Sequence, residues 1–298
     1  MTAGRRTRRP AALVAAALVA VAACTDPAPS FVATPTPVPE ATAKVTTYTL
    51  GTTVWYEGLK IDVVSVTATL DQRGGPVEVL LHLENATTED SSLDGPVTLL
   101  VGTVRADPTR DSTIPDLPAG STGATTLTYE LQGISSLDTA VLEIGAGPLH
   151  VARVPLTPSA GSVLAFEPQE LSLSGSGTSG TLKLTLRKGE LRWDLPDWSQ
   201  ELDASLQALT ITYDATYTGD FSGGFAFTGD NVALKLPDGT VVSARRDGHS
   251  QSVELIAAKK TKKGLISRFE IPAGLTGTFA LLVLNGTSPR KTIPFKID

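Results

Sequence analysis

The sequence has few of the residues that metal and nucleophilic chemistry require. It holds one cysteine, Cys24, so no disulfide can form within the chain. Its three histidines are scattered, without the His-x-x-x-His spacing or the cysteine partners of a zinc site. A G-x-S-x-G motif, which would present a nucleophilic serine on a sharp turn, is absent from the sequence. We therefore expect neither an enzyme nor a bound cofactor.

Aromatic residues are also scarce, at 5% of the chain, whereas hydrophobic residues make up 41%. A core must therefore be built mainly from Val, Leu and Ile, and the length of 298 residues fits two domains. Residues 1–23 carry four arginines and no acid, which leaves 21 basic and 31 acidic residues, or a net charge of −10, in the rest. Because phosphate binding needs a basic face, we expect no nucleic acid partner.

The longest apolar run, residues 11–23, is too short to span a membrane. Its 13 residues would rise about 20 Å as a helix, against about 30 Å of bilayer hydrocarbon. Arginines precede the run, and Val21-Ala22-Ala23-Cys24 ends it, which resembles the lipobox of bacterial lipoproteins. The resemblance implies a signal peptide at 1–23 and a lipid anchor on Cys24 that holds the chain at the extracytoplasmic face of the cell membrane. Ala20-Val21-Ala22 also fits ordinary secretory cleavage, which stays open as the alternative.

Prolines mark the segment that begins at the cysteine. Residues 24–44 contain five of them, which deny the segment a helix and leave it extended. Its Pro/Thr/Ala bias resembles the tethers of lipoproteins from high-GC Gram-positive bacteria. At about 3.1 Å per residue the segment would reach about 60 Å, and we expect it to hold the following body off the membrane.

From Val45 onward, alternation of apolar and polar residues dominates. In residues 77–84, Val and Leu alternate with Glu and His, which is typical of a half-buried strand. Pro237-Asp238-Gly239-Thr240 between two alternating segments indicates a hairpin. We expect an all-β fold of two tandem immunoglobulin-like β-sandwich domains, at 45–157 and 163–298, joined by a hinge at 158–162.

The two halves of the chain share short matches at an offset of 140 residues. With one gap, they pair Tyr129-Glu130-Leu131 with Phe269-Glu270-Ile271, Ala140-Val141-Leu142 with Ala280-Leu281-Leu282, and Val154-Pro155-Leu156 with Ile293-Pro294-Phe295. A competing register pairs Pro118-Ala119-Gly120 with Pro272-Ala273-Gly274. We prefer the offset of 140 because it joins several strands in order. Upstream, the same repeat sets Gly58 opposite Gly189.

The first domain, residues 45–157, resembles the telokin-like, immunoglobulin-fold domains of bacterial lipoproteins, a large group of unknown function. The motifs that carry the resemblance are Gly58-Leu59-x-Ile61-x-Val63, the long strand 77–85, Leu117-Pro118-Ala119-Gly120 and Leu127-x-Tyr129-x-Leu131. The second domain departs further, notably in residues 193–203. The resemblance brings no catalytic residues, and it implies extracytoplasmic binding or scaffolding.

Four lysines gather near a predicted turn of the second domain. Lys259, Lys260, Lys262 and Lys263 lie between two alternating segments, and a hairpin would place all four at one tip. Such a tip either discourages pairing of strand edges or contacts anionic lipid head groups or wall polymers. Trp198 is the second candidate for an exposed contact, whereas Trp193 alternates with leucines and is expected in the core.

Acidic residues gather in two loops. Glu89, Asp90 and Asp94 are the candidates for a calcium ion, which needs several converging oxygens, although the EF-hand spacing is absent and a solvated loop is the alternative. A second group, within residues 194–203, lies beside Trp193 and Trp198. Two carboxyl groups with aromatic neighbours leave a carbohydrate-active hydrolase as an alternative.

The sequence thus predicts a lipid-anchored, non-catalytic binding or scaffold protein of the bacterial envelope. Its expected partner is an envelope protein or a wall polymer, besides the membrane that Cys24 would engage. A carrier of a small ligand or metal ion at the cell surface is the first alternative, and the hydrolase is the second.

Overall fold

The computed structural model describes residues 42–246 and 253–298, and residues 41–298 form one compact unit. The described residues contain no α-helix, and their only helical turns are the 3-10 turns η1 (Pro196–Trp198) and η2 (Gly229–Asn231). They include no helix that is long and apolar enough to cross a membrane. The predicted signal peptide, Cys24, most of the predicted tether and His249 lie outside the described residues.

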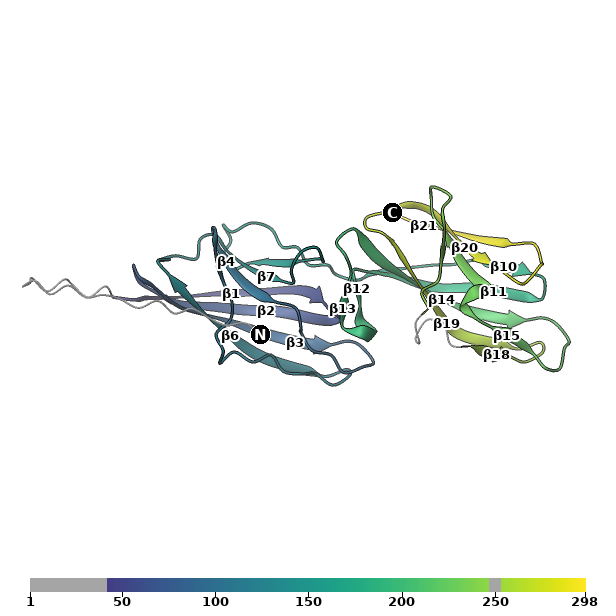
Figure 1. Cartoon of the computed structure of the whole chain (residues 1–298), viewed down its shortest axis with the longest axis horizontal. Helices are drawn as coiled ribbons and strands as arrows, with labels where there is room; N and C mark the ends of the chain where they lie inside the picture. Colours follow the sequence, from purple (N-terminus) through teal and green to yellow (C-terminus); the bar gives the residue numbers. More distant parts are fainter. Residues whose placement is uncertain (1–41, 247–252) are drawn as a thin grey trace, which may run out of the picture. The chain divides into compact units, whose positions relative to one another are not determined.

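Two antiparallel sheets form the first sandwich (Figure 1). One sheet has the order β1-β2-β3-β6, with β1 (Lys44–Tyr56), β2 (Leu59–Leu70), β3 (Gly74–Asn85) and β6 (Thr122–Gln132). The other has the order β5-β4-β7-β8, with β4 (Val97–Val101), β5 (Val104–Ala106), β7 (Ala140–Ile144) and β8 (Ala152–Pro155). Lys44, the last residue of the predicted tether, already belongs to β1.

Alternation explains why β3 lies where it does. Val77, Val79 and Leu81 are fully buried, while the intervening Glu78 and His82 are exposed, as the period of two predicts. The buried side chains pack against the second sheet, and each contributes about 1.5–3 kcal/mol on leaving water. The predicted strand is confirmed.

The second sandwich also has two antiparallel sheets. The first has the order β10-β11-β14-β19, with β9 beside β11, and comprises β9 (Gln169–Leu171), β10 (Ser176–Ser179), β11 (Leu182–Arg192), β14 (Leu206–Tyr217) and β19 (Thr261–Pro272). The second has the order β17-β16-β20-β21, with β16 (Val232–Lys235), β17 (Val241–Ser243), β20 (Gly277–Val283) and β21 (Lys291–Ile297). The predicted hairpin at residues 237–240 is confirmed, because it joins the paired strands β16 and β17.

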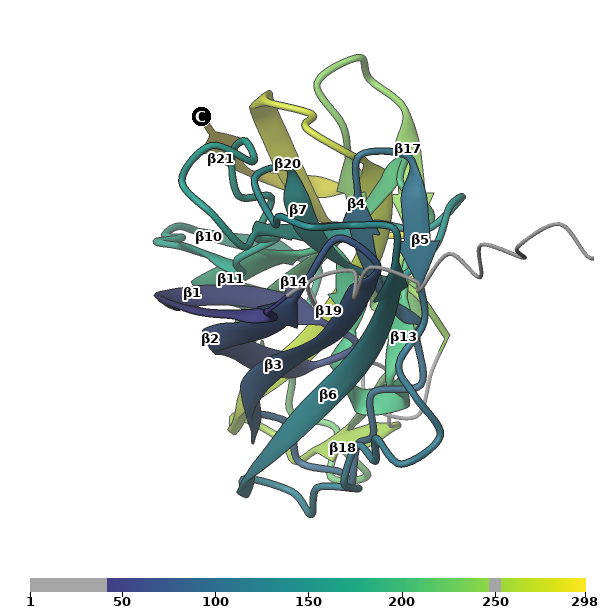
Figure 2. The same ribbon diagram turned by 90° about the vertical axis from the view of Figure 1, so that its left-hand side faces the viewer.

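Two small two-stranded sheets complete the second sandwich. One consists of β12 (Asp194–Leu195) and β13 (Gln200–Glu201), with η1 between them. The other consists of β15 (Phe225–Phe227) and β18 (Glu254–Ile256). Figure 2 gives a second view, in which β13 and β18 of these sheets are labelled.

The strand orders of the two sandwiches correspond, and they favour the offset of 140. The matched tripeptides fall on β6 and β19, on β7 and β20, and on β8 and β21, which occupy the same places in their sheets. The competing match is not equivalent, because Pro118 precedes β6 whereas Pro272 ends β19. The pairing of Gly58 with Gly189 is wrong: Gly58 lies before β2, but Gly189 lies near the end of β11.

The structural counterpart of Gly58 is Gly180. Each precedes the second strand of its sheet, and their φ angles are +82° and +56°. Both are left-handed conformations, which glycine adopts without the penalty that a Cβ brings.

Each sandwich holds its own hydrophobic core. The first is built from buried residues between Val54 and Leu156, and the second from residues between Leu171 and Ile297. The predicted hinge, residues 158–162, falls between the two cores in sequence. A third, smaller cluster of Leu195, Leu202 and Ala208 packs beside β12 and β13.

Candidate functional site

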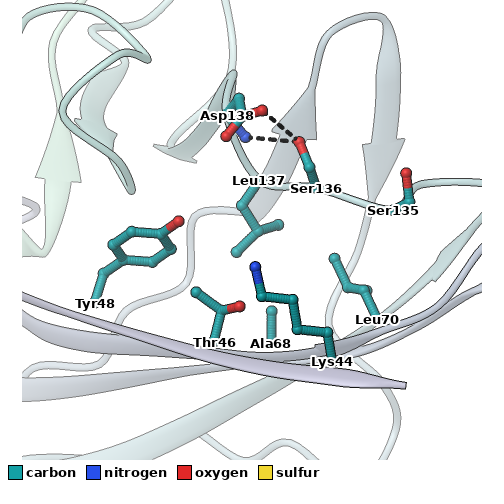
Figure 3. A pocket seen from close by; sticks show the side chains of 9 residues that line it. All are labelled: Lys44, Thr46, Tyr48, Ala68, Leu70, Ser135, Ser136, Leu137 and Asp138. Carbon is teal, nitrogen blue, oxygen red and sulfur yellow. Dashed lines mark hydrogen bonds between the residues drawn. The ribbon is translucent and has the colours of Figure 1, made fainter. Parts of the chain in front are cut away.

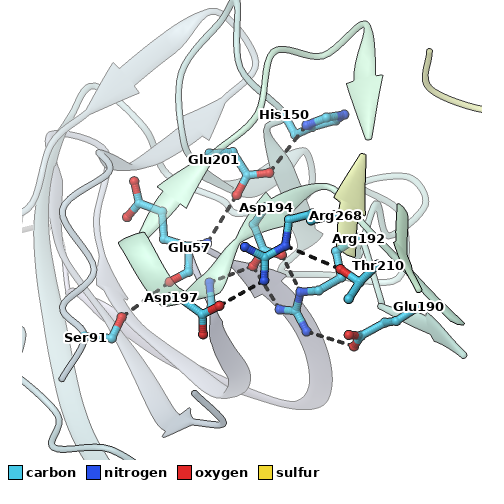
Figure 4. A network of polar contacts seen from close by, with 11 residues as sticks. Glu57, Ser91, His150, Glu190, Arg192, Asp194, Asp197, Glu201, Thr210 and Arg268 are labelled. Carbon is cyan, nitrogen blue, oxygen red and sulfur yellow. Dashed lines mark hydrogen bonds and ion pairs between the residues drawn. The ribbon is translucent and has the colours of Figure 1, made fainter. Parts of the chain in front are cut away.

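Charged side chains from the two sandwiches meet in a buried polar network, which we call the junction (Figure 4). The first sandwich contributes Glu57, in the turn between β1 and β2, and His150, just before β8. The second contributes Arg192 at the end of β11, Asp194 on β12 and Glu201 on β13. All five are buried. A buried charge is costly unless it is paired, so the contacts of each decide what the junction does.

Asp194 accepts a hydrogen bond from the first sandwich and forms an ion pair within the second. The Gly58 backbone N–H donates to its Oδ2 at 2.6 Å. The Arg192 guanidinium binds both of its oxygens, Nε to Oδ1 at 2.6 Å and Nη2 to Oδ2 at 3.0 Å. This bidentate geometry is the strong form of an arginine–carboxylate pair. Burial disfavours the arginine cation, yet Asp194 and Glu190 hold the pKa of Arg192 above its ordinary value.

Glu201 makes the second bridge between the sandwiches. The Glu57 backbone N–H donates to its Oε2 at 3.2 Å, and His150 Nδ1 lies 3.4 Å from its Oε1. Burial raises the pKa of Glu201 to about 7, the His150 contact opposes this, and the Asp194 charge adds to it. Near neutral pH this buried carboxyl group is therefore partly protonated.

Glu57 is held from several directions. Its φ of +50° is unusual for a residue with a side chain. Its Oε2 accepts hydrogen bonds from the backbone N–H groups of Asp94 at 3.1 Å and Gly95 at 3.2 Å, and its backbone carbonyl accepts one from the Ser91 hydroxyl. Burial raises the pKa of Glu57, and the two backbone donors lower it. The strained backbone is thus fixed by contacts on both its main chain and its side chain.

The tautomer of His150 follows from its neighbours. Nδ1 lies 3.1 Å from the Leu202 carbonyl and 3.4 Å from Glu201 Oε1. A carbonyl only accepts, so Nδ1 carries the hydrogen. Nε2 is buried and has no hydrogen-bond partner among the described residues, while the ring packs edge-on against Phe166 at 4.9 Å. The imidazole is therefore oriented by the second sandwich although it belongs to the first.

Three buried carboxyl groups in the junction share two basic partners. The Asp194 charge raises the pKa of both Glu57 and Glu201, so the three groups are electrostatically coupled. Arg192 neutralises Asp194, and His150 contacts Glu201. The arrangement holds two sandwiches together, and its charge balance changes when Glu201 gains or loses its proton.

The sequence pointed to only part of the junction. Asp194 and Glu201 belong to an acidic group that was expected to lie in a loop, but both are buried in a two-stranded sheet. Asp197, from the same group, pairs with Arg268 at 2.9 Å. Glu57 and His150 carried no signal, because their contacts with the other sandwich, to Glu201 and Leu202, span 144 and 52 residues.

A small cleft opens beside the junction. Its volume is about 240 Å³, and the residues that line it include Arg192, Glu190, Asp197, Arg268 and Thr210. The two arginines face two carboxylates across it, with Arg192–Glu190 at 3.3 Å and Arg268–Asp197 at 2.9 Å. The charges of this cleft are therefore largely matched within the chain.

The four lysines stand at a turn, but not in the predicted hairpin. Strand β18 pairs with β15 and strand β19 pairs with β14, so the turn connects two different sheets. Lys259 lies in the turn with a φ of +58°, and Lys262 and Lys263 lie on β19. All four side chains are exposed, and Lys259 and Lys262 pair with Asp220 at 2.7 Å and Glu254 at 2.9 Å.

The two tryptophans of residues 193–198 differ in environment. Trp198 ends η1 and is 36% exposed, with the guanidinium groups of Arg268 and Arg245 at 5.1 Å and 5.8 Å from its ring. It thus offers an exposed edge on a well-held ring. Trp193 is only half-buried and packs against Phe166 at 5.8 Å, so the expectation of a core position is wrong.

The acidic loop of the first sandwich does not gather its carboxylates. Asp90 accepts a hydrogen bond from the Ala119 backbone at 3.2 Å, and Asp94 accepts one from Ser92 at 2.7 Å. At Glu89 the backbone carbonyl, not the carboxylate, is engaged, by Asn85 at 2.8 Å. Across residues 42–246 and 253–298, no three His, Cys, Asp or Glu side chains lie close enough to hold a metal ion.

A cavity of about 210 Å³ lies at one end of the first sandwich (Figure 3). Lys44, Thr46 and Tyr48 of β1 line it together with the loop 135–138. That loop is held by its own contacts, since Ser136 Oγ donates to Asp138 Oδ2 at 2.8 Å. The cavity offers one lysine, one carboxylate and one phenol to a small polar molecule.

Comparison with known proteins assigns no function to this arrangement. No family model matches the chain, and no curated protein matches its sequence. Among solved structures, the crystal structure of a conserved domain protein from Bacillus anthracis is similar at 12% identity and a TM-score of 0.27. The similarity covers 85% of this chain and 91% of that one.

Proposed function

We propose that the chain is a non-catalytic binding or scaffold protein of the bacterial envelope, anchored by lipid on Cys24 at the extracytoplasmic face of the membrane. One observation carries the proposal: the coupled ionisable groups of the junction are buried and engaged in joining the two sandwiches. Buried groups of this kind fix the position of one sandwich against the other. The exposed lysine turn and the strand edges are then the parts that meet a partner, an envelope protein or a wall polymer.

Crosslinking in living cells tests the binding role. A photoreactive residue at Lys260 is expected to capture one defined, saturable envelope component. The matched control places the same group at Lys235, an exposed lysine on β16. Equal capture from both positions would contradict a specific contact at the lysine turn. Lipidation has its own test: globomycin is expected to cause the unprocessed precursor to accumulate, and Cys24→Ser to abolish incorporation of labelled fatty acid.

A carrier of a small ligand is the second candidate, and the cavity beside β1 is the observation that favours it. Its volume of about 210 Å³ and its lining by Lys44, Tyr48 and Asp138 suit a small polar molecule. Native mass spectrometry of the protein purified from its own cells is expected to show a retained mass that Tyr48→Ala abolishes. The unliganded mass alone would contradict this candidate.

A further inference from the structure

Two large apolar side chains are exposed beside the lysine turn. Phe221, in the loop between β14 and β15, is 68% exposed, and Leu255, on β18, is 69% exposed. Single exposed apolar residues are ordinary on protein surfaces, whereas adjacent ones mark contact sites. The distance between Phe221 and Leu255 therefore decides whether they can act as one contact site.

Two consecutive glycines show how the two side chains are placed. A Cβ on Gly223 would lie 2.5 Å from the Phe221 ring, so the ring covers Gly223. A Cβ on Gly224 would lie 3.3 Å from Leu255 Cδ1, so Leu255 covers Gly224. A backbone hydrogen bond of 2.9 Å from Gly224 N–H to the Phe221 carbonyl closes the turn. Phe221 and Leu255 thus lie over consecutive residues of one glycine turn, and we call the two side chains the apolar pair.

Ion pairs tie two of the lysines to the chain neighbours of the apolar pair. Lys259 pairs with Asp220, the neighbour of Phe221 in the chain, and Lys262 pairs with Glu254, the neighbour of Leu255. With Lys260 and Lys263, the tip carries four lysines against two acids, a local charge of +2. The whole chain has a formal charge of −6, so this tip is of opposite sign to the rest.

We propose that the apolar pair, ringed by Lys259, Lys260, Lys262 and Lys263, inserts into the head-group region of a bilayer that contains anionic phospholipid. A hydrated wall polymer would use the lysines but offer Phe221 and Leu255 no hydrocarbon. A neutral bilayer would take the apolar pair but leave the lysines without partners. Of these three surfaces the anionic bilayer is the one that uses both features, because burial of apolar side chains and attraction of basic ones act together there. The inference goes beyond the proposed function and does not need the lipid on Cys24.

Vesicle sedimentation tests the proposal with a chain that begins at Thr25, which keeps every residue of both hydrophobic cores. The probes are vesicles of equal parts phosphatidylcholine and phosphatidylglycerol, compared with phosphatidylcholine alone. We expect binding to the anionic vesicles only. Phe221→Ser with Leu255→Ser is expected to weaken it at least tenfold, because the serines remove apolar surface that would leave water on insertion. Lys260→Gln with Lys263→Gln is expected to weaken it about tenfold at low salt.

Matched controls change the same chemistry elsewhere on the second sandwich. Val241→Ser removes an exposed apolar residue of β17, and Lys235→Gln with Lys291→Gln removes two exposed lysines; neither is expected to change binding. Phe221→Trp is expected to keep binding and to shift its fluorescence to the blue on anionic vesicles. Circular dichroism checks that each variant is folded.

Three results would overturn the proposal. Failure to bind the anionic vesicles would do so, while leaving the crosslinking test of the binding role intact. Binding that is indifferent to Phe221→Ser with Leu255→Ser, and that soluble poly(glycerol phosphate) abolishes, would assign the tip to an anionic polymer. Binding to phosphatidylcholine as strong as to the anionic mixture would remove the lysines from the mechanism.

Discussion

The junction and the lysine turn use charged residues in opposite ways. At the junction, Asp194 and Glu201 are buried and each contacts both sandwiches. At the turn, all four lysines are exposed, and their ion pairs lie in solvent. Removal of a buried partner leaves an uncompensated charge, whereas an exposed pair contributes about 0–1 kcal/mol. The comparison therefore assigns stability to the junction and leaves the exposed turn as the place of the proposed contacts.

The largest effect is expected from Asp194→Ala. It leaves the buried Gly58 N–H without its acceptor and removes the bidentate partner of the buried Arg192 cation, which costs about 3–5 kcal/mol. Urea unfolding measures the change. Glu190→Gln, at the half-exposed rim of the same network, is the control and is expected to change the free energy of unfolding by less than about 1 kcal/mol. Equal losses for both would mean that burial of the pair is not what matters.

The second effect is a dependence of stability on pH. The pKa of Glu201 is raised to about 7 in the folded chain from an ordinary value of 4.5. A raised carboxyl pKa means that the folded state binds the extra proton. The contribution of the protonated Glu201 to the free energy of unfolding is therefore fully present below about pH 4.5. It is lost as pH rises through about 7, by roughly 3 kcal/mol in all.

Urea unfolding between pH 4.5 and 8 measures this dependence, and Glu201→Gln is its control. The glutamine cannot ionise, so the decline between these pH values is expected to flatten. A variant with the pH profile of the unaltered chain would show that Glu201 does not carry the effect.

Glycine substitutions give the third effect and separate backbone strain from contact. Ala at Gly58 meets a φ of +82° and would place its Cβ 2.8 Å from Thr87 and 2.9 Å from Pro196. Ala at Gly51 meets a similar φ of +61° with nothing within 4 Å. We expect Gly51→Ala to cost about 1 kcal/mol and Gly58→Ala about 1–2 kcal/mol more. Thermal unfolding compares the two variants. Equal costs would show that Thr87 and Pro196 move to make room for the added Cβ at Gly58.

The smallest effect on stability is expected at the lysine turn. Lys260→Gln with Lys263→Gln removes two exposed charges and should change the free energy of unfolding by less than about 0.5 kcal/mol. The same urea experiment measures it. A loss as large as that of Asp194→Ala would contradict the division between a stabilising junction and a binding turn.

Strand patterns were read well from the sequence because their cause is local. The period of two in β3 and the hairpin between β16 and β17 each depend on residues close together in the chain. The offset of 140 was found because similar local patterns occur in both halves. The hairpin expected at the lysines failed, because β18 pairs with β15 rather than with β19, a choice made by distant segments. The expected core position of Trp193 is wrong for a similar reason. Its partner, Phe166, comes from the segment between the two cores.

What the sequence determined by itself is the all-β architecture and its doubling. Alternating apolar residues bury one face of a strand whatever the strand later pairs with, so this part of the fold is set by local pattern and hydrophobic burial. The tertiary structure alone decided the junction and the apolar pair. Glu57 meets Glu201 across 144 residues, and Leu255 reaches Gly224 across 31. Contacts between side chains so far apart leave no periodic trace, because they depend on how complete sandwiches and loops come together.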